Sequence, residues 1–221
     1  MDLTPFVCPT KFLYARRRLT EPAPWILDVG CGNHSPSVTK HWFPGSHYSG
    51  ADIQRYNLDD RDLASMDDFY TVTADGSGYA AVPDSSYDLV LLHHVVEHMS
   101  DPIPILIELC SKLKPGGYIW IAFPSIRSLG MPQAAAGTLQ FCDDDTHIHV
   151  PDVREISNAL LENGVRILHA GRTKDTARTF VGLGVLPWRL LMWALTGKLN
   201  VYGLWYLLGF EDHVFGQRRP R

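Results

Sequence analysis

Short apolar runs alternate with helix-like patterns and turn signals between Trp25 and about Arg172. This alternation is typical of repeated βαβ units, which form a parallel sheet with helices on its faces. With 45% apolar and 20% charged residues among 221, the chain can bury a sizeable core, and a disordered chain is excluded. We expect strands at Trp25–Gly30, Tyr48–Ile53, Phe69–Asp75, Tyr87–His94, Tyr118–Ser125 and Val165–Arg172.

Two helices are well marked between these strands. Pro102–Lys114 places its apolar residues largely on one stripe, and Pro115-Gly116-Gly117 should end it and turn the chain into the next strand. A second helix begins near Asp152, where Asp-Val-Arg-Glu matches a capping box, and closes at Asn163-Gly164. A short leading helix is expected around Lys11–Leu19.

Two segments depart from the alternation. Ile126–His149 is a long connection after the fifth strand, and loops of this length are usually lids, binding loops or disordered. Thr176–Phe210 is apolar and should be helical in pieces, because Pro187 and five glycines interrupt it before His213–Arg219 resumes a strand-like run. Its tryptophans and apolar residues suit a lid over a hydrophobic substrate, a membrane anchor or a dimer surface. A fourth interpretation is ordinary packing of the segment against the sheet.

The charge balance and the cysteines limit the partners and the compartment. With 20 basic against 24 acidic residues the chain offers no broad cationic face, so nucleic acid is not expected, although Arg16-Arg17-Arg18 and the basic tail at 218–221 keep RNA as a competing substrate. Four cysteines without a CxxC pattern, and a start without a signal-like segment, indicate a reducing, cytoplasmic compartment. Arg189 and Lys198 interrupt the most apolar stretch, so no transmembrane span is expected.

The most informative motif is the run from Ile26 to His34. A strand leads into Gly30-Cys31-Gly32, where the glycines let the backbone pass close to a ligand. Twenty residues beyond Gly32, Asp52 ends the second strand, where its carboxylate could accept hydrogen bonds from both hydroxyls of a ribose. A dinucleotide fingerprint needs a third glycine, which is replaced here, and no P-loop pattern exists, so these residues indicate a nucleoside site other than one for NAD or FAD.

In their order these motifs resemble those of class I S-adenosylmethionine-dependent methyltransferases, and they are closest to the small ubiquinone-biosynthesis-like branch. The resemblance covers roughly residues 25–172. It implies an α/β, Rossmann-like, seven-stranded, mostly parallel sheet with an antiparallel last strand, at His213–Arg219, and an apolar helical insertion before it. The matching residues are Leu27 to Gly32, Asp52, Asp75-Gly76, Pro83 to Val90, Val96-Glu97-His98 and Leu113 to Gly117.

The resemblance also implies S-adenosyl-L-methionine as the cofactor and a role for each matching residue. Asp28 could instead be a turn acid, and Asp75 could merely cap the turn at Ser77. The implied set is Asp28 and the backbone of Gly30, Cys31 and Gly32 for the methionine part, His93 at its carboxylate end, Asp52 for the ribose, Ile53 beside the adenine, and Asp75 with Gly76 at the adenine amino group.

Methyl transfer from a sulfonium is an in-line displacement, so a base is needed only if the acceptor must lose a proton. His147 and His149 end the long loop and His94 follows the fourth strand, so both groups lie at carboxyl ends of strands and are the catalytic candidates. A solvated loop histidine, or one bonded to its own helix start, is the plainer interpretation of each.

The sequence His94-x-x-Glu97-His98 has the spacing of a divalent metal site on one helical face. Some relatives bind a metal with Glu-x-x-Glu-His here. His94 replaces the first of these glutamates, and Glu-His is common in the wider family without metal, so we assign no metal ligand.

We therefore expect a methyltransferase that acts on a small-molecule or lipid-like acceptor, with oxygen the expected atom. The alternative is a catalytically silent nucleoside-binding protein attached to a membrane or a partner by residues 180–210. We expect a cytoplasmic monomer or homodimer that can lie at the inner membrane face. The expected parts are an N-terminal helix or lid segment (1–24), a cofactor-binding core (25–175), an apolar helical insertion (176–210), and a last strand with a basic tail (211–221).

Overall fold

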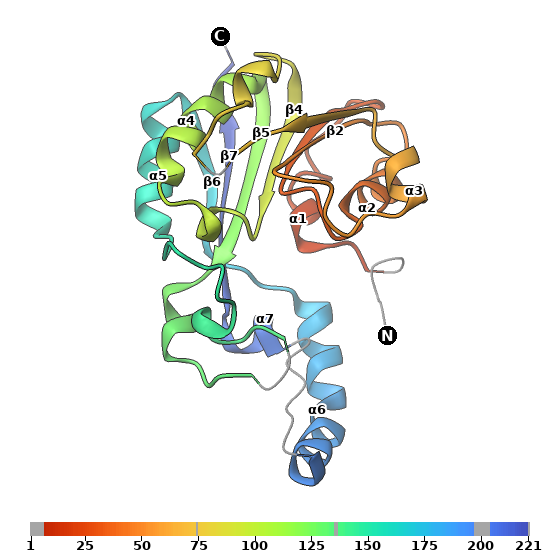
Figure 1. The fold of residues 1–221 in the computed structure, drawn as a ribbon, viewed down its shortest axis with the longest axis vertical. Coiled ribbons are helices and arrows are strands. Elements are labelled where there is room, and N and C mark those ends of the chain that lie inside the picture. Colours follow the sequence, from red (N-terminus) through yellow and green to blue (C-terminus); the bar gives the residue numbers. More distant parts are fainter. Residues whose placement is uncertain (1–6, 74, 135–136, 197–203, 221) are drawn as a thin grey trace.

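The computed structural model describes residues 7–73, 75–134, 137–196 and 204–220. Its centre is a seven-stranded sheet with the strand order β3-β2-β1-β4-β5-β7-β6 (Figure 1). The first five strands pair in parallel, and β7 is antiparallel to both of its neighbours, so the expected sheet is confirmed. The strands are β1 (Trp25–Val29), β2 (His47–Asp52), β3 (Asp68–Thr71), β4 (Tyr87–His93), β5 (Leu113–Pro124), β6 (Val165–Arg172) and β7 (Glu211–Arg218).

Helices surround this sheet, and short 3-10 turns follow several strands. The α-helices are α1 (Thr10–Leu13), α2 (Ser35–Trp42), α3 (Asp60–Ala64), α4 (Pro102–Lys112), α5 (Val153–Glu162), α6 (Thr176–Thr196) and α7 (Leu204–Leu208), and the 3-10 turns are η1 (Tyr79–Ala81), η2 (Val96–His98), η3 (Ile126–Gly130) and η4 (Phe141–Asp143).

The sheet carries an apolar core on each face. On one face α4 and α5 bury Leu106 and Leu160 against strand residues such as Val90. On the other face α1 places Phe12 in a cluster with Trp120 of β5. Because side chains alternate along a strand, strands covered on both sides need apolar residues at nearly every position, which is why they appear as continuous apolar runs in the sequence.

Two strand boundaries differ from the expected ones by more than two residues. β5 begins at Leu113, because Pro115-Gly116-Gly117 forms an irregularity inside the strand, with a register shift opposite β4, instead of a turn before it. β3 ends at Thr71, and the chain then makes a turn in which the Thr73 backbone N–H donates to the Ser77 carbonyl. Both differences come from local turn geometry, which leaves the strand order unchanged.

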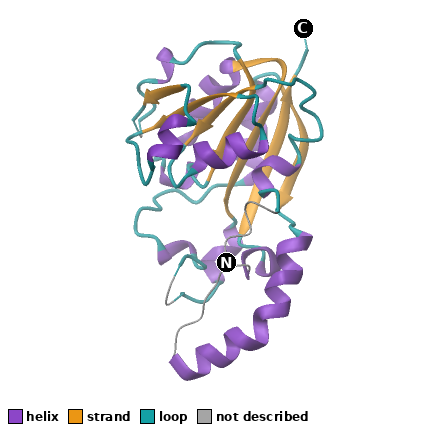
Figure 2. Ribbon diagram, turned by 90° about the vertical axis from the view of Figure 1, so that its right-hand side faces the viewer, coloured by secondary structure: helices purple, strands orange, loops and turns teal. Residues whose placement is uncertain are grey.

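The apolar segment before β7 was expected as helical pieces, and its main part is instead a single helix. α6 continues through Pro187, which removes one backbone donor, and Figure 2 shows the helix bending partway along. Lys198 lies outside the described residues. No membrane span was expected because of Arg189 and Lys198. By length and composition alone, however, α6 is long and apolar enough to cross a membrane although it contains Arg189.

α6, α7 and the connection after β5 lie together beyond the end of the sheet to which β5 points (Figure 1). The connection is fixed by its own contacts: Leu139 and Phe141 are buried, and the carboxylate of Asp143 accepts hydrogen bonds from three backbone N–H groups. The indole N–H of Trp205 in α7 donates to the carbonyl of Thr138 at 2.6 Å. This region therefore packs against the carboxyl edge of the parallel strands, where a ligand of an open α/β sheet binds.

Candidate functional site

The turn after β1 needs glycine at both predicted positions. Gly30 has a φ of +72°, and a Cβ there would lie 2.3 Å from Val95 Cγ2. A Cβ on Gly32 would lie 3.0 Å from the carbonyl oxygen of Tyr56. The turn is therefore a tight backbone cradle at the carboxyl end of β1.

Ser35 stands where a dinucleotide fingerprint has its third glycine, and Asn33 and His34 precede it. Both have a positive φ, at 53° and 62°, so two side-chain residues adopt a backbone conformation that glycine adopts more easily. His34 Nδ1 lies 2.6 Å from Asp62 Oδ2, and this hydrogen bond raises the pKa of His34. Its side chain thus fixes the turn to α3.

Asp28 is buried beneath the same turn. Its Oδ2 accepts hydrogen bonds from the hydroxyls of Ser35, at 2.5 Å, and Tyr48, at 2.9 Å, and it lies 3.5 Å from Lys11 Nζ. Cys31 is also buried, and burial raises the pKa of its thiol. The Asp28 contacts fit the alternative of a turn acid and join four elements: α1, β1, α2 and β2.

Asp52 and Ile53 lie beside this turn at the carboxyl end of β2. The Asp52 carboxylate accepts the backbone N–H of Ile53 at 2.7 Å and faces the backbone N–H of Gly32. Its partial burial raises its pKa. Ile53 is 60% exposed although it is apolar. An acceptor and an apolar side chain next to a glycine cradle suit a ribose and a base.

Asp75 follows β3 in an exposed turn. Its carboxylate accepts hydrogen bonds from the Thr73 hydroxyl and from the Ser77 backbone N–H, which lower its pKa. Gly76, at a φ of +90°, leaves room for Ile105. These contacts match the capping alternative for Asp75, while its exposure leaves the carboxylate open to a ligand.

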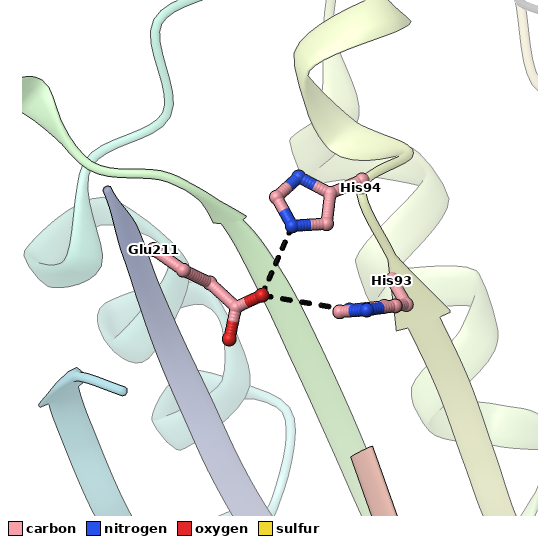
Figure 3. A group of neighbouring side chains, drawn as sticks. All are labelled: His93, His94 and Glu211. Atoms are coloured by element: carbon pink, nitrogen blue, oxygen red, sulfur yellow. Dashed lines mark hydrogen bonds and ion pairs between the residues drawn. The ribbon is translucent and has the colours of Figure 1, made fainter. Parts of the chain in front are cut away.

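Figure 3 shows three residues that meet across the sheet: His93 and His94 at the end of β4, and Glu211 at the start of β7. His94 Nε2 lies 3.0 Å from Glu211 Oε2, and His94 Nδ1 lies 3.0 Å from Glu97 Oε1. Burial alone would lower the pKa of His94, but the bonds to the two carboxylates raise it to about 10. At neutral pH His94 is an imidazolium and has no free lone pair for a base.

Glu97 also connects this cluster to the long loop. Its carbonyl oxygen accepts the backbone N–H groups of Ile148, at 2.9 Å, and His149, at 3.1 Å. His147 Nε2 lies 4.0 Å from Glu97 Oε1, while His147 Nδ1 bonds to the carbonyl of Phe141 at 2.7 Å. The candidate histidines at the end of β4 and on the long loop are thus brought together through Glu97.

The expected helical face of His94, Glu97 and His98 does not form. η2 is only three residues long, and His94 precedes it with a φ of +57°. The donor atoms fall into two sets instead, His93, His94 and Glu211 in one, and Glu97, His98 and His147 in the other.

Three features of the site were not found in the sequence. Glu211 precedes an ordinary strand pattern, and Lys11 lies in the leading helix, so neither belongs to a local motif. Trp205 is one of the tryptophans of the apolar segment, and its ring lies 5.3 Å from that of His94 and 4.5 Å from that of Phe210. These three residues reach the site through tertiary contacts, which the periodicity of a sequence cannot predict.

Comparisons with known proteins agree with this geometry. The sequence profile of a family described as a methyltransferase domain matches residues 10–170. An uncharacterized methyltransferase of Schizosaccharomyces pombe is 31% identical over 127 residues, which are 52% of this chain and 44% of that protein. The ubiquinone biosynthesis O-methyltransferase of Vibrio cholerae is 27% identical over 169 residues, 69% of this chain and 67% of that enzyme. The match therefore spans less than half of the first relative and about two thirds of the second.

Solved structures show the same fold. An S-adenosylmethionine-dependent methyltransferase from Mesorhizobium loti superposes with a TM-score of 0.63 at 17% identity, covering 96% of this chain and 99% of that one. A phosphoethanolamine N-methyltransferase of Haemonchus contortus, solved with S-adenosyl-L-methionine, gives 0.61 at 14% identity, covering 96% of this chain and 52% of that one. At these identities the likeness concerns the fold.

Proposed function

Because the chain belongs to the S-adenosylmethionine-dependent methyltransferase family, as its sequence motifs predicted, we propose that it transfers a methyl group to an oxygen of a small-molecule or lipid-like acceptor. The observation that carries this proposal is the position of Asp52 beside the Gly30–Gly32 cradle at the carboxyl edge of the sheet. S-adenosylmethionine supplies an activated methyl group on a sulfonium. The protein's contribution is then to bind and orient the two reactants.

We assign the cofactor contacts as follows. The backbone of Gly30, Cys31 and Gly32 borders the methionine part, and the Asp52 carboxylate accepts from the ribose hydroxyls. Ile53, exposed beside Asp52, flanks the adenine. Asp75 and Gly76 border the adenine amino group, and His93 the methionine end. Asp28 supports the turn from beneath through Ser35 and Tyr48.

For the acceptor we assign the base to His147. When its Nδ1 donates to the Phe141 carbonyl, the neutral ring keeps Nε2 as an acceptor for a proton. His149 is a second candidate on the same loop. His94 is unsuited to this role because it is already protonated, and it acts as a positioning group between Glu97 and Glu211.

The lipid-like character of the acceptor is supported by α6. Its exposed residues include Phe180, Val181 and Leu183 before Pro187, and Trp188, Leu191 and Trp193 after it. At 100° per residue these side chains point in several directions around the helix, whereas a dimer contact needs only one stripe. An apolar surface around most of the helix favours a lipid environment, with Arg178 and Arg189 on the remaining side, and α6 leaves the body at the edge where the site lies.

Calorimetry with S-adenosylhomocysteine, followed by transfer of a labelled methyl group to hydroxylated metabolites and lipids, tests the proposal. Micromolar binding and transfer to an oxygen are expected. Binding without transfer to any acceptor would favour the alternative of a silent nucleoside-binding protein. Binding of NADH in place of S-adenosylhomocysteine would refute the methyltransferase proposal.

A further inference from the structure

Glu211 is a buried carboxylate, 1% exposed, that no sequence motif assigns to the site. Its Oε2 is paired with His94, at 3.0 Å, and lies 3.9 Å from His93 Nδ1. Its Oε1 is buried and makes no hydrogen bond of ordinary geometry among the described residues, and the same holds for His93 Nδ1. Besides His94, the Thr173 hydroxyl acts on the Glu211 carboxylate and helps to lower its pKa. Figure 3 shows that Glu211, on β7, reaches across β5 to both histidines of β4.

The cluster carries an excess of negative charge. Glu97 and Glu211 are two carboxylates around the single imidazolium of His94, and Glu97 Oε2 is a further buried oxygen without a partner. Burial would raise the pKa of Glu211, but the hydrogen bond from His94 and the positive charge of that ring lower it to about 2. The nearby cations bond elsewhere: Lys11 bonds to Ser35, and Arg178 bonds to Asp175.

His93 is the side of this cluster that a ligand can reach. Its side chain is 31% exposed, although its Nδ1 is buried. Burial and the positive charge of His94 lower the pKa of His93, so its ring is neutral and one of its nitrogens can accept a hydrogen bond. The unpaired oxygens here are carboxylate acceptors, and a buried acceptor costs free energy until a donor meets it.

We propose that Glu211 Oε1 and His93 form a subsite for a protonated primary amine. An ammonium group supplies several N–H donors and the positive charge that the cluster lacks. Two molecules of the proposed reaction can bring such a group: the cofactor through the ammonium of its methionine part, and the methyl acceptor through an amine of its own. The identity of these two molecules rests on the proposed function, because both take part in the proposed methyl transfer.

The test is calorimetry on the intact chain with Glu211→Gln, which keeps the shape and removes the charge. The probes are S-adenosylhomocysteine, which has the ammonium, and methylthioadenosine, which lacks the amino-acid part. If the cofactor is the source, the variant should bind S-adenosylhomocysteine about 10- to 100-fold more weakly and methylthioadenosine unchanged. If the acceptor is the source, octylamine binding should weaken while octanol binding does not.

Two further variants keep the result decisive. Asp212→Asn changes the next carboxylate of β7, whose side chain points to the opposite face, and it should alter neither affinity. His93→Ala keeps the Glu211–His94 pair and should lower the same affinity in the same direction, even if Glu211→Gln does not fold. Equal losses for methylthioadenosine, no loss for any amine, or stoichiometric binding of Zn²⁺ or Mn²⁺ in place of the amines would overturn the proposal. These readouts need no methyl transfer, so a failure of the proposed reaction is seen separately.

Discussion

His147 Nε2 lies 4.0 Å from Glu97 Oε1, which joins a loop histidine after β5 to the turn after β4. This contact links the proposed base to the His94 cluster, because the same Glu97 oxygen bonds to His94. A base on this loop therefore has a defined position relative to the end of β4, where the reacting groups are expected.

His147→Ala should lower turnover by about 10²- to 10⁴-fold, the usual contribution of a general base, and leave cofactor affinity nearly unchanged. His149→Ala should lower turnover less, because the contact of His149 with Glu97 is made by its backbone. Single-turnover rates and calorimetry with S-adenosylhomocysteine separate the two quantities. Unchanged turnover in His147→Ala, or equal losses of turnover and cofactor affinity, would return these histidines to a structural role.

Asp52→Ala should weaken S-adenosylhomocysteine by ~1–3 kcal/mol, because the ribose hydroxyls lose a charged acceptor. Calorimetry measures this change. Asp60→Ala is the matched control, since Asp60 is an exposed carboxylate of α3. Undiminished affinity in Asp52→Ala would remove the ribose contact from the proposed site.

The Glu211–His94 pair should make stability depend on pH in a defined window. The pKa of His94 is raised from 6.5 to about 10, so its contribution is complete below pH 6.5 and is lost as the pH rises through about 10. The pKa of Glu211 is lowered from 4.5 to about 2, so its contribution is complete above pH 4.5 and is lost as the pH falls through about 2. The largest effect of the pair therefore falls between pH 4.5 and 6.5.

In that window Glu211→Ala should cost about 3–5 kcal/mol of unfolding free energy, because one partner of a buried charge pair is removed. Urea unfolding of both proteins at a series of pH values gives the difference. The difference should shrink toward pH 9 to 10 as His94 loses its proton. A difference that stays constant from pH 5 to 10 would contradict the assigned charges.

The protein should sediment with lipid vesicles through α6. Trp193→Glu or Leu195→Glu should abolish this, because both side chains are exposed, and cofactor affinity should stay the same. Trp205→Glu is unsuitable as a test of the membrane contact alone, since Trp205 packs against His94. A wild-type protein that stays unbound to vesicles, with Trp193 inaccessible to aqueous quenchers, would assign α6 to a protein contact instead.

The strands and the cradle were predictable because each depends on residues close together in the chain. Leu27 to Gly32 specify a strand followed by a tight turn, and Asp52 lies one βαβ unit later. Glu211 was missed because it meets His94 only across β5, 117 residues away in sequence. Glu211 belongs to no motif in the sequence, so a pattern search has nothing to detect there.

α6 and the turn at η2 show the other limit. Pro187 and several glycines favoured broken helices, but a proline disrupts a limited stretch of backbone bonding and the helix continues with a bend. The histidine and glutamate spacing suited one helical face, yet His94 precedes the three-residue η2 with a positive φ. His94 still pairs with Glu97, while His98 bonds to Thr146 on the long loop. Spacing predicts a common face only where the helix is long enough to impose its period.

β7 lies between β5 and β6, although it follows both in the chain. A nascent chain that has not yet reached residue 211 leaves β5 with an open edge, and β6 cannot join the sheet in its final position. Glu211 is also the residue that pairs with His94, so the strand that completes the sheet also delivers the second carboxylate of the charged cluster. A chain released before β7 is made would therefore lack both a closed sheet and the carboxylate that pairs with His94.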